Sequence, residues 1–100
     1  MSRFVLTSDA SEDLREIIEF IREDSPNAAR RVLGEFRETM RKLARMPGMG
    51  HLRQDLADES LRFWPIYSYL IIFRPETKPL EIVRVLRGSR DVLSILQSNR

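Results

Sequence analysis

Three apolar runs in the second half of the chain constrain its fold most strongly. They cover residues 61–66, 67–73 and 80–86 and are rich in aromatic and β-branched side chains. Runs of this length and composition, bounded by turn residues, predict β-strands. Residues 74–79 separate the last two runs, and the two prolines there fit a loop because they cannot donate ladder hydrogen bonds. The sequence therefore predicts a three-stranded antiparallel meander.

Two amphipathic helices are predicted before these strands. Asp9, with Glu12 three residues later, has the spacing of a capping box at the start of the first helix. Ser25 is a favourable N-cap for the second helix, and Pro26 suits its first position. Each helix has one apolar stripe, formed by Ala10, Leu14, Ile17, Ile18 and Ile21 in the first and by Ala29, Val32, Leu33, Phe36, Met40, Leu43 and Ala44 in the second.

The order of these elements predicts an α+β fold. The second helix is expected to run from about residue 26 to about residue 46, and its short connection to the first makes the pair an antiparallel hairpin. A short N-terminal strand is predicted at residues 4–7. A short C-terminal helix is predicted at residues 91–96, with Asp91 as its cap.

Length and composition limit the class of protein. One hundred residues fit a single domain, residues 1–100, and the absence of cysteine excludes both a disulfide framework and a thiolate zinc site. No run of about 18 apolar residues is present to span a bilayer, and the N-terminus lacks the pattern of a secretory signal. We therefore expect a cytoplasmic protein without a cofactor, a metal or a membrane partner.

Charge is distributed unevenly along the chain. Residues 1–24 carry three arginines and seven acidic residues, whereas the remainder carries 14 basic and 8 acidic residues. Fifteen of the 17 basic residues are arginine, whose planar fork suits carboxylate or phosphate. The abundance of arginine is explained either by a GC-rich genome or by a partner that is acidic, a nucleic acid or a nucleoprotein machine, and the first explanation is the simpler one.

The arginines around the predicted strands are the candidate partner-binding residues. Alternation along residues 80–88 predicts that Ile82, Arg84 and Leu86 share one face. For Arg84, an internal ion pair with Glu76, Glu81 or Asp91 and a contact with a partner are both open. With one tyrosine, the predicted partner-binding set is Arg62, Tyr69, Arg74, Arg84, Arg87 and Arg90.

His51 is the single histidine and therefore the natural candidate for proton transfer near neutral pH. It follows Gly50 in a polar segment and has no neighbour in the sequence placed to orient it. We interpret His51 as a loop residue, and the sequence predicts no catalytic residue.

The pattern of the whole chain resembles the ParE/RelE superfamily of bacterial toxins, on the ParE-like, plasmid-stabilisation side. Each matching segment is short, but their joint order is specific. The main segments are Leu6-Thr7, Asp13-Leu14, Ala28-Ala29-Arg30, Leu43-Ala44-Arg45-Met46-Pro47, Arg53-Gln54-Asp55-Leu56, Leu61-Arg62, Tyr69-Leu70-Ile71, Phe73-Arg74 and Glu81-Ile82-Val83-Arg84-Val85-Leu86 with Gly88, Arg90 and Asp91.

The resemblance implies the toxin of a type II toxin-antitoxin system. It implies neutralisation by a cognate ParD-like antitoxin, in a heterotetramer or larger complex, and inhibition of DNA gyrase without sequence-specific nucleic-acid binding by the toxin alone. Two alternatives remain open: a RelE-like ribosome-dependent mRNA endoribonuclease, and a non-toxic derivative that only binds antitoxin.

One position departs from the pattern of the superfamily. Where relatives often carry histidine after the last strand, this chain has Arg87, and no tyrosine follows Tyr69. RNA cleavage needs a base for the 2′-hydroxyl and an acid for the leaving oxygen, and arginine serves poorly as either. The sequence therefore favours the gyrase inhibitor over the nuclease.

Overall fold

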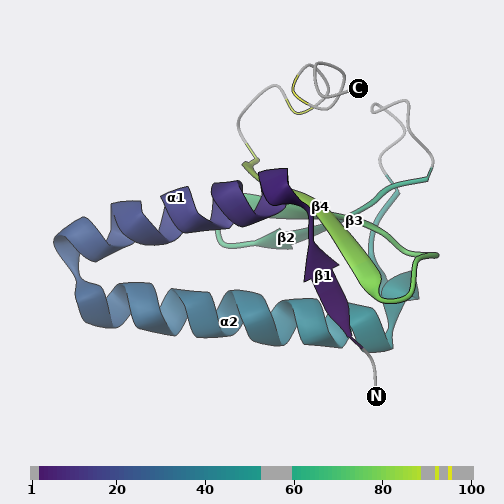
Figure 1. Ribbon diagram of the computed structural model, residues 1–100, viewed down its shortest axis with the longest axis horizontal. Coiled ribbons are helices and arrows are strands. Elements are labelled where there is room, and N and C mark those ends of the chain that lie inside the picture. Colours follow the sequence, from purple (N-terminus) through teal and green to yellow (C-terminus); the bar gives the residue numbers. More distant parts are fainter. Residues whose placement is uncertain (1–2, 53–59, 89–91, 93–94, 96–100) are drawn as a thin grey trace.

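The computed structural model describes residues 3–52 and 60–88 together with Val92 and Ile95. Its elements are β1 (Phe4–Leu6), α1 (Ser8–Asp24), α2 (Pro26–Arg45), the 3₁₀ turn η1 (Pro47–Met49), β2 (Arg62–Ile66), β3 (Tyr69–Arg74) and β4 (Leu80–Arg87). The helices form a long hairpin, and the sheet lies against one side of it (Figure 1). The α+β class and the hairpin are confirmed.

The sheet has four strands in the order β1-β4-β3-β2 and is mixed. β2 pairs antiparallel with β3 and β3 pairs antiparallel with β4, whereas β1 pairs parallel with β4. The predicted sheet, a three-stranded antiparallel meander, is therefore wrong as a complete description. The sequence reasoning placed a strand at the N-terminus but did not assign it a partner, and the helical hairpin is the crossover that makes a parallel partner possible.

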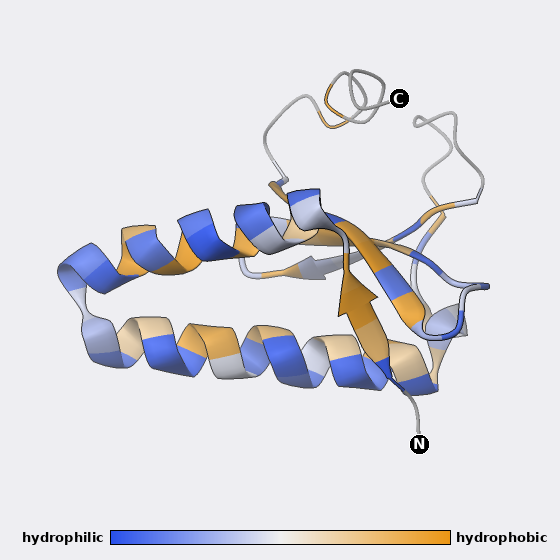
Figure 2. Cartoon of the chain, viewed as in Figure 1, coloured by the Kyte–Doolittle hydropathy of each residue, from blue (hydrophilic) through white to orange (hydrophobic). Residues whose placement is uncertain are grey.

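Two apolar clusters lie on opposite faces of the sheet. The first joins the stripes of both helices to the sheet through residues such as Phe36, Ile71 and Phe73, all fully buried. Figure 2 shows the apolar positions of α1 and α2 on the sides that the helices turn toward each other. The second cluster contains Leu61, Phe63, Ile72, Leu86 and Val92, with Ile95 packed against it.

The predicted C-terminal helix at residues 91–96 falls largely outside the described residues, as does its proposed cap Asp91. Val92 and Ile95 are described, and both contribute to the second apolar cluster. Val92 and Ile95 therefore pack on the sheet face opposite the helical hairpin. Among the described residues the fold is defined by two helices and four strands.

The two helix starts differ in how well they were predicted. Ser25 caps α2 as expected, since its hydroxyl accepts a hydrogen bond from the Ala28 amide at 3.1 Å. The predicted capping box of α1 is wrong, because Thr7 is the N-cap and accepts from the Ala10 amide at 3.0 Å. Asp9 instead lies in the first turn, where its negative charge interacts favourably with the positive end of the helix dipole.

A β-bulge in β4 overturns the predicted alternation. Ile72 pairs with Arg84 and Phe73 pairs with Ile82, so Val83 is an extra residue in β4. Ile82 consequently belongs to the first apolar cluster and Leu86 to the second. The prediction that Ile82, Arg84 and Leu86 share one face is wrong, because one inserted residue reverses the faces beyond it.

Candidate partner-binding surfaces

Arg84 is held inside the protein by Asp13 of α1. The Arg84 Nε and Nη2 atoms donate to the two carboxylate oxygens at 2.7 and 2.9 Å, and the two side chains are 15% and 13% exposed. The hydrogen bonds that Arg84 donates to the Asp13 carboxylate raise the pKa of Arg84. The internal ion pair considered for Arg84 exists, but its acid is none of those predicted. Arg84 is therefore mostly buried, in an ion pair within the protein.

Asp13 also seals the free edge of β4. β1 pairs only with residues 80–82, so the longer β4 extends beyond it. Beyond that point the Asp13 carboxylate accepts from the Val85 amide at 3.0 Å, and the Thr7 hydroxyl donates to the Val83 carbonyl at 2.8 Å. Thr7 and Asp13 thus provide hydrogen-bond partners for backbone groups of β4 that β1 does not pair with.

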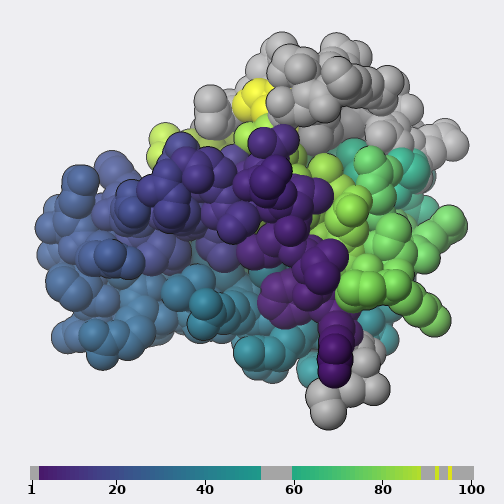
Figure 3. All heavy atoms as spheres, viewed as in Figure 1, coloured from purple at the N-terminus to yellow at the C-terminus, as the bar shows by residue number. Residues whose placement is uncertain are grey.

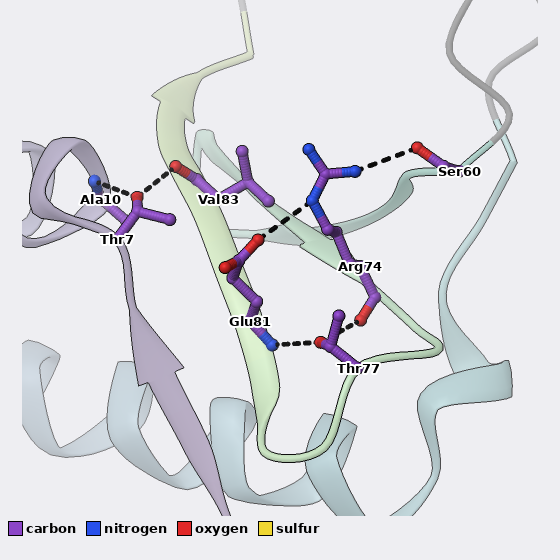
Figure 4. A network of polar contacts seen from close by, with 7 residues as sticks. All are labelled: Thr7, Ala10, Ser60, Arg74, Thr77, Glu81 and Val83. Carbon is purple, nitrogen blue, oxygen red and sulfur yellow. Dashed lines mark hydrogen bonds and ion pairs between the residues drawn. The ribbon is translucent and has the colours of Figure 1, made fainter.

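Arg74 takes part in a network at the β3–β4 loop (Figure 4). Its Nε donates to Glu81 at 3.0 Å and its Nη1 donates to the Ser60 hydroxyl at 3.1 Å. Thr77 closes the loop, because its hydroxyl donates to the Arg74 carbonyl and accepts from the Glu81 amide. The Arg74 and Glu81 side chains are 40% and 38% exposed, so this pair orders the loop at a modest energetic gain.

The remaining predicted residues do not form one cluster. Arg62 begins β2 beside the end of β3, where its guanidinium donates to the Leu61 carbonyl at 3.0 Å. Arg87 ends β4 opposite Tyr69, at the other end of the sheet. Their partners on β3, Phe73 and Tyr69, are four residue positions apart along the strand, or about 13 Å. Arg90 lies outside the described residues.

Tyr69 and Arg87 do come together, in a hollow of about 360 Å³ between α1 and the end of β4. We call this the β4-end hollow, and its lining is Asp13, Glu16, Ile17, Phe20, Tyr69, Val85, Leu86 and Arg87. Phe20 on its rim is 62% exposed, and sequence reasoning missed it. The sequence could have indicated that Phe20 is exposed, because it is apolar but falls outside the apolar stripe of the first helix.

A second hollow, the hairpin groove, runs between α1 and α2 beside β1 and measures about 300 Å³. Leu14, Ile18 and Leu33 belong to its apolar lining. The charged residues around it comprise one acid, Glu19, and three arginines. The complete lining is Phe4, Leu6, Ser11, Leu14, Arg15, Ile18, Glu19, Arg22, Leu33, Arg37 and Met40. Its electrostatic character is therefore basic.

Tyr67 occupies the β2–β3 turn in a left-handed conformation, with φ of 54°. Such a backbone is uncommon for residues other than glycine. The side chain is 56% exposed, its ring lies 6.5 Å from that of Phe36, and its hydroxyl donates to Glu35 of α2. The turn is therefore tied to the helical hairpin by a tyrosine that the sequence analysis did not single out.

The contact with Glu35 sets the titration of Tyr67. The hydrogen bond from the phenol to the carboxylate raises the pKa of Tyr67 above its ordinary value of 10. We expect Glu35→Gln to return that pKa toward 10, because the amide favours the neutral phenol less strongly. The ¹³Cζ shift of Tyr67 followed against pH measures both values, and equal pKa values in the two proteins would contradict the contact.

His51 is a structural residue at the edge of the sheet. Its backbone exchanges two hydrogen bonds with Phe63, at 2.8 and 2.9 Å, and its ring stacks on Trp64 with centroids 5.6 Å apart. The prediction that His51 is a loop residue is refined, since it forms an isolated β-bridge. Within the described ranges no three His, Cys, Asp or Glu side chains gather in a metal-binding group.

No helix among the described residues has both the length and the apolar composition needed to cross a bilayer. The described surfaces include two hollows lined by both apolar and charged side chains, and the described arginines of the predicted partner-binding set are divided between ion pairs within the protein and separate ends of the sheet. Surfaces of this kind, with exposed aromatic and arginine side chains beside apolar ones, suit contact with a macromolecule.

Comparison with known proteins gives a consistent picture. Residues 4–92 match the model of the family described as the ParE toxin of the type II toxin-antitoxin system, parDE. Among solved structures, the chain is similar to one from the chromosomal ParDE toxin-antitoxin system of P. aeruginosa, with a TM-score of 0.68 and 21% identity over 87% of this chain and 96% of that chain. No curated protein sequence matches the chain.

Proposed function

This chain belongs to the ParE toxin family of type II toxin-antitoxin systems, and from that membership we propose that it is a toxin that acts by inhibiting DNA gyrase and is neutralised by direct binding of a cognate antitoxin. The observation that carries the proposal is the family match over residues 4–92, which spans every described helix and strand. We propose that residues 1–100 act as one domain in the cytoplasm.

The hairpin groove supports the antitoxin part of the proposal. An apolar groove beside two helices, next to a strand at the edge of a sheet, is a surface that a partly disordered segment recognises by folding on it. We propose a ParD-like antitoxin as the partner, in a heterotetramer or a larger complex.

The β4-end hollow supports a target contact made by shape and charge. Tyr69 and Arg87 are retained as proposed contacts, and Phe20 is added because its exposed ring stands on the same rim. Aromatic and arginine side chains are enriched among the residues that dominate protein–protein binding. Arg74 and Arg84 are withdrawn from the direct contact set, since both are engaged in ion pairs within the protein.

The positions of the arginines favour gyrase inhibition over RNA cleavage. A ribonuclease needs cations gathered around one phosphate with an acid and a base beside them. Here Arg62 and Arg87 stand at opposite ends of the sheet, Arg84 is bound to Asp13, and His51 stacks on Trp64.

Expression of the chain alone in bacteria tests the proposal. We expect growth arrest with filamentation, because blocked replication halts division while the cells still lengthen, and we expect the antitoxin from the adjacent open reading frame to restore growth. Arrest of translation without filamentation would favour the RelE-like nuclease. Antitoxin binding without any growth arrest would identify a derivative that has lost toxicity.

A further inference from the structure

A further hollow lies at the end of the molecule where α2 ends. The start of β1, the end of α2 and the β3–β4 loop meet there (Figure 1). The hollow measures about 350 Å³, and its lining is Arg3, Ala44, Pro47, Pro75, Thr77, Lys78, Pro79 and Leu80. We call it the loop pocket. Figure 3 shows β1, in purple, beside the green atoms of β4, with which it pairs.

The rim of the loop pocket is fixed by the backbone. Three of its residues are prolines, whose rings restrict the φ angle. The Thr77 hydroxyl donates to the Arg74 carbonyl at 3.1 Å and accepts from the Glu81 amide at 2.8 Å. The Leu80 amide donates to the Arg3 carbonyl at 2.9 Å and so joins the end of the loop to β1. The pocket is therefore preformed, and little conformational entropy is lost when a ligand binds it.

Both charged side chains in the lining of the loop pocket are cations. Arg3 and Lys78 line it and no carboxylate does, whereas the β4-end hollow and the hairpin groove each include carboxylates in their lining. Arg3 and Lys78 are exposed, and neither forms an ion pair with a residue in the described ranges. Of the acids near the loop, Glu81 is paired with Arg74, and Glu76 is not part of the lining. The pocket therefore attracts an anion.

Positive charge continues from the loop pocket onto the end of α2. Lys42 and Arg45 occupy the last turn of this helix, next to Ala44 of the lining, and both are exposed. The negative end of the helix dipole opposes an anion here, and the two cations offset that effect within the same turn. A ligand that carries anionic groups at intervals along its length fits this surface better than one small anion.

We propose that the loop pocket and the end of α2 bind the phosphate backbone of duplex DNA without reading its sequence. Arg3 and Lys78 contact phosphate oxygens, and deoxyribose carbons lie against the proline rings. Contacts to phosphate and sugar position a protein on a duplex but carry no base information. The choice of DNA rests on the proposed function, since gyrase acts on DNA, and it gives the toxin a contact with the DNA in addition to the enzyme.

A titration of the ¹⁵N-labelled native chain with a short DNA duplex, followed through its amide chemical shifts, tests the location. We expect the largest shifts at Arg3, Thr77, Lys78 and Leu80, and equal affinity for two duplexes of unrelated sequence. No shifts, or the largest shifts at Arg87 in the β4-end hollow, would overturn the inference. Tighter binding of ATP or of single-stranded RNA than of the duplex would also overturn it, because the ligand would then be of another class.

Charge reversal tests the chemistry of the contact. Lys78→Glu should weaken the Kd for the duplex by about tenfold or more and make binding less dependent on salt, because fewer counterions are released when a phosphate contact is lost. Arg30→Glu is the matched control, since it changes the charge equally at an exposed position near the other end of α2. Equal weakening by both variants would show that net charge alone drives binding, and the inference would fail.

The DNA contact and the gyrase proposal fail separately, because binding to the duplex is measured without gyrase. A chain that inhibits gyrase but does not bind the duplex removes only the DNA contact. A chain that binds the duplex at the loop pocket but leaves gyrase fully active removes only the gyrase proposal.

Discussion

Replacing Asp13 with alanine is expected to lower the free energy of unfolding by about 3–5 kcal/mol. The substitution leaves the Arg84 guanidinium, 15% exposed, without its counter-ion and leaves the Val85 amide at the edge of β4 without an acceptor. The free energy of unfolding of a small domain is about 5–15 kcal/mol in total, so the expected loss is a large fraction of it. Urea denaturation followed by circular dichroism measures the loss.

Glu12→Ala is the matched control for this prediction. Glu12 also pairs with an arginine on α1, but that pair is more than half exposed on both sides and should contribute less than about 1 kcal/mol. Replacing both Asp13 and Arg84 by apolar residues should recover part of the loss, because no unpaired charge remains. If Asp13→Ala costs no more than Glu12→Ala, the ion pair does not hold α1 to β4.

Gly50→Ala is expected to destabilise the protein by about 1–3 kcal/mol, since a core that is already filled does not accept another methyl group. A Cβ at Gly50 would overlap the Phe73 ring and lie 2.8 Å from the Arg62 Cβ. Phe73 is fully buried and has no room to retreat. The midpoint of urea denaturation, compared with that of the unmodified protein, measures the effect.

Gly48→Ala separates this steric effect from the general effect of replacing glycine. Gly48 lies two residues earlier, and a Cβ there would meet no atom within 4 Å. Alanine at Gly48 should be neutral or stabilise by up to about 1 kcal/mol through the unfolded state. Equal midpoints for the two variants would show that Gly50 does not make room for Phe73.

The helical hairpin was largely predictable because its signals are local. The apolar stripes follow the helical period. Ser25 and Pro26 mark the start of α2, and the Ala28 amide that Ser25 caps is close to them in the sequence. The cap of α1 was assigned two residues too late, because Asp9 and Thr7 are both capable caps. Thr7 is the cap because of where the preceding strand ends, and its hydroxyl also donates a hydrogen bond to the Val83 carbonyl.

The pairing of distant residues was not predictable from one sequence. Asp13 and Arg84 are 71 residues apart, and several acids near Arg84 in the sequence were equally plausible partners. The bulge at Val83 leaves no clear mark either, since β-branched residues occur on both sides of it. An error of one residue there reverses every face that follows, which is why Ile82 was wrongly expected to share a face with Arg84 and Leu86.

Of the candidate partner-binding residues that the structure describes, Tyr69 and Arg87 line the same hollow. The sequence shows where the arginines are but not which carboxylates will pair with them. Arg74 and Arg84 were therefore included, although both form ion pairs within the protein. Conversely, Arg22 and Arg37 line the hairpin groove but were not in the predicted set, because the sequence alone does not place them beside β1.

The supercoiling of relaxed plasmid by purified DNA gyrase, measured with increasing amounts of this chain, tests the proposed function most directly. We predict that supercoiling falls as the chain is added and that premixed antitoxin restores it. A ribosome programmed with messenger RNA should remain free of new cleavage in parallel. Unchanged supercoiling together with cut messenger RNA would contradict the account.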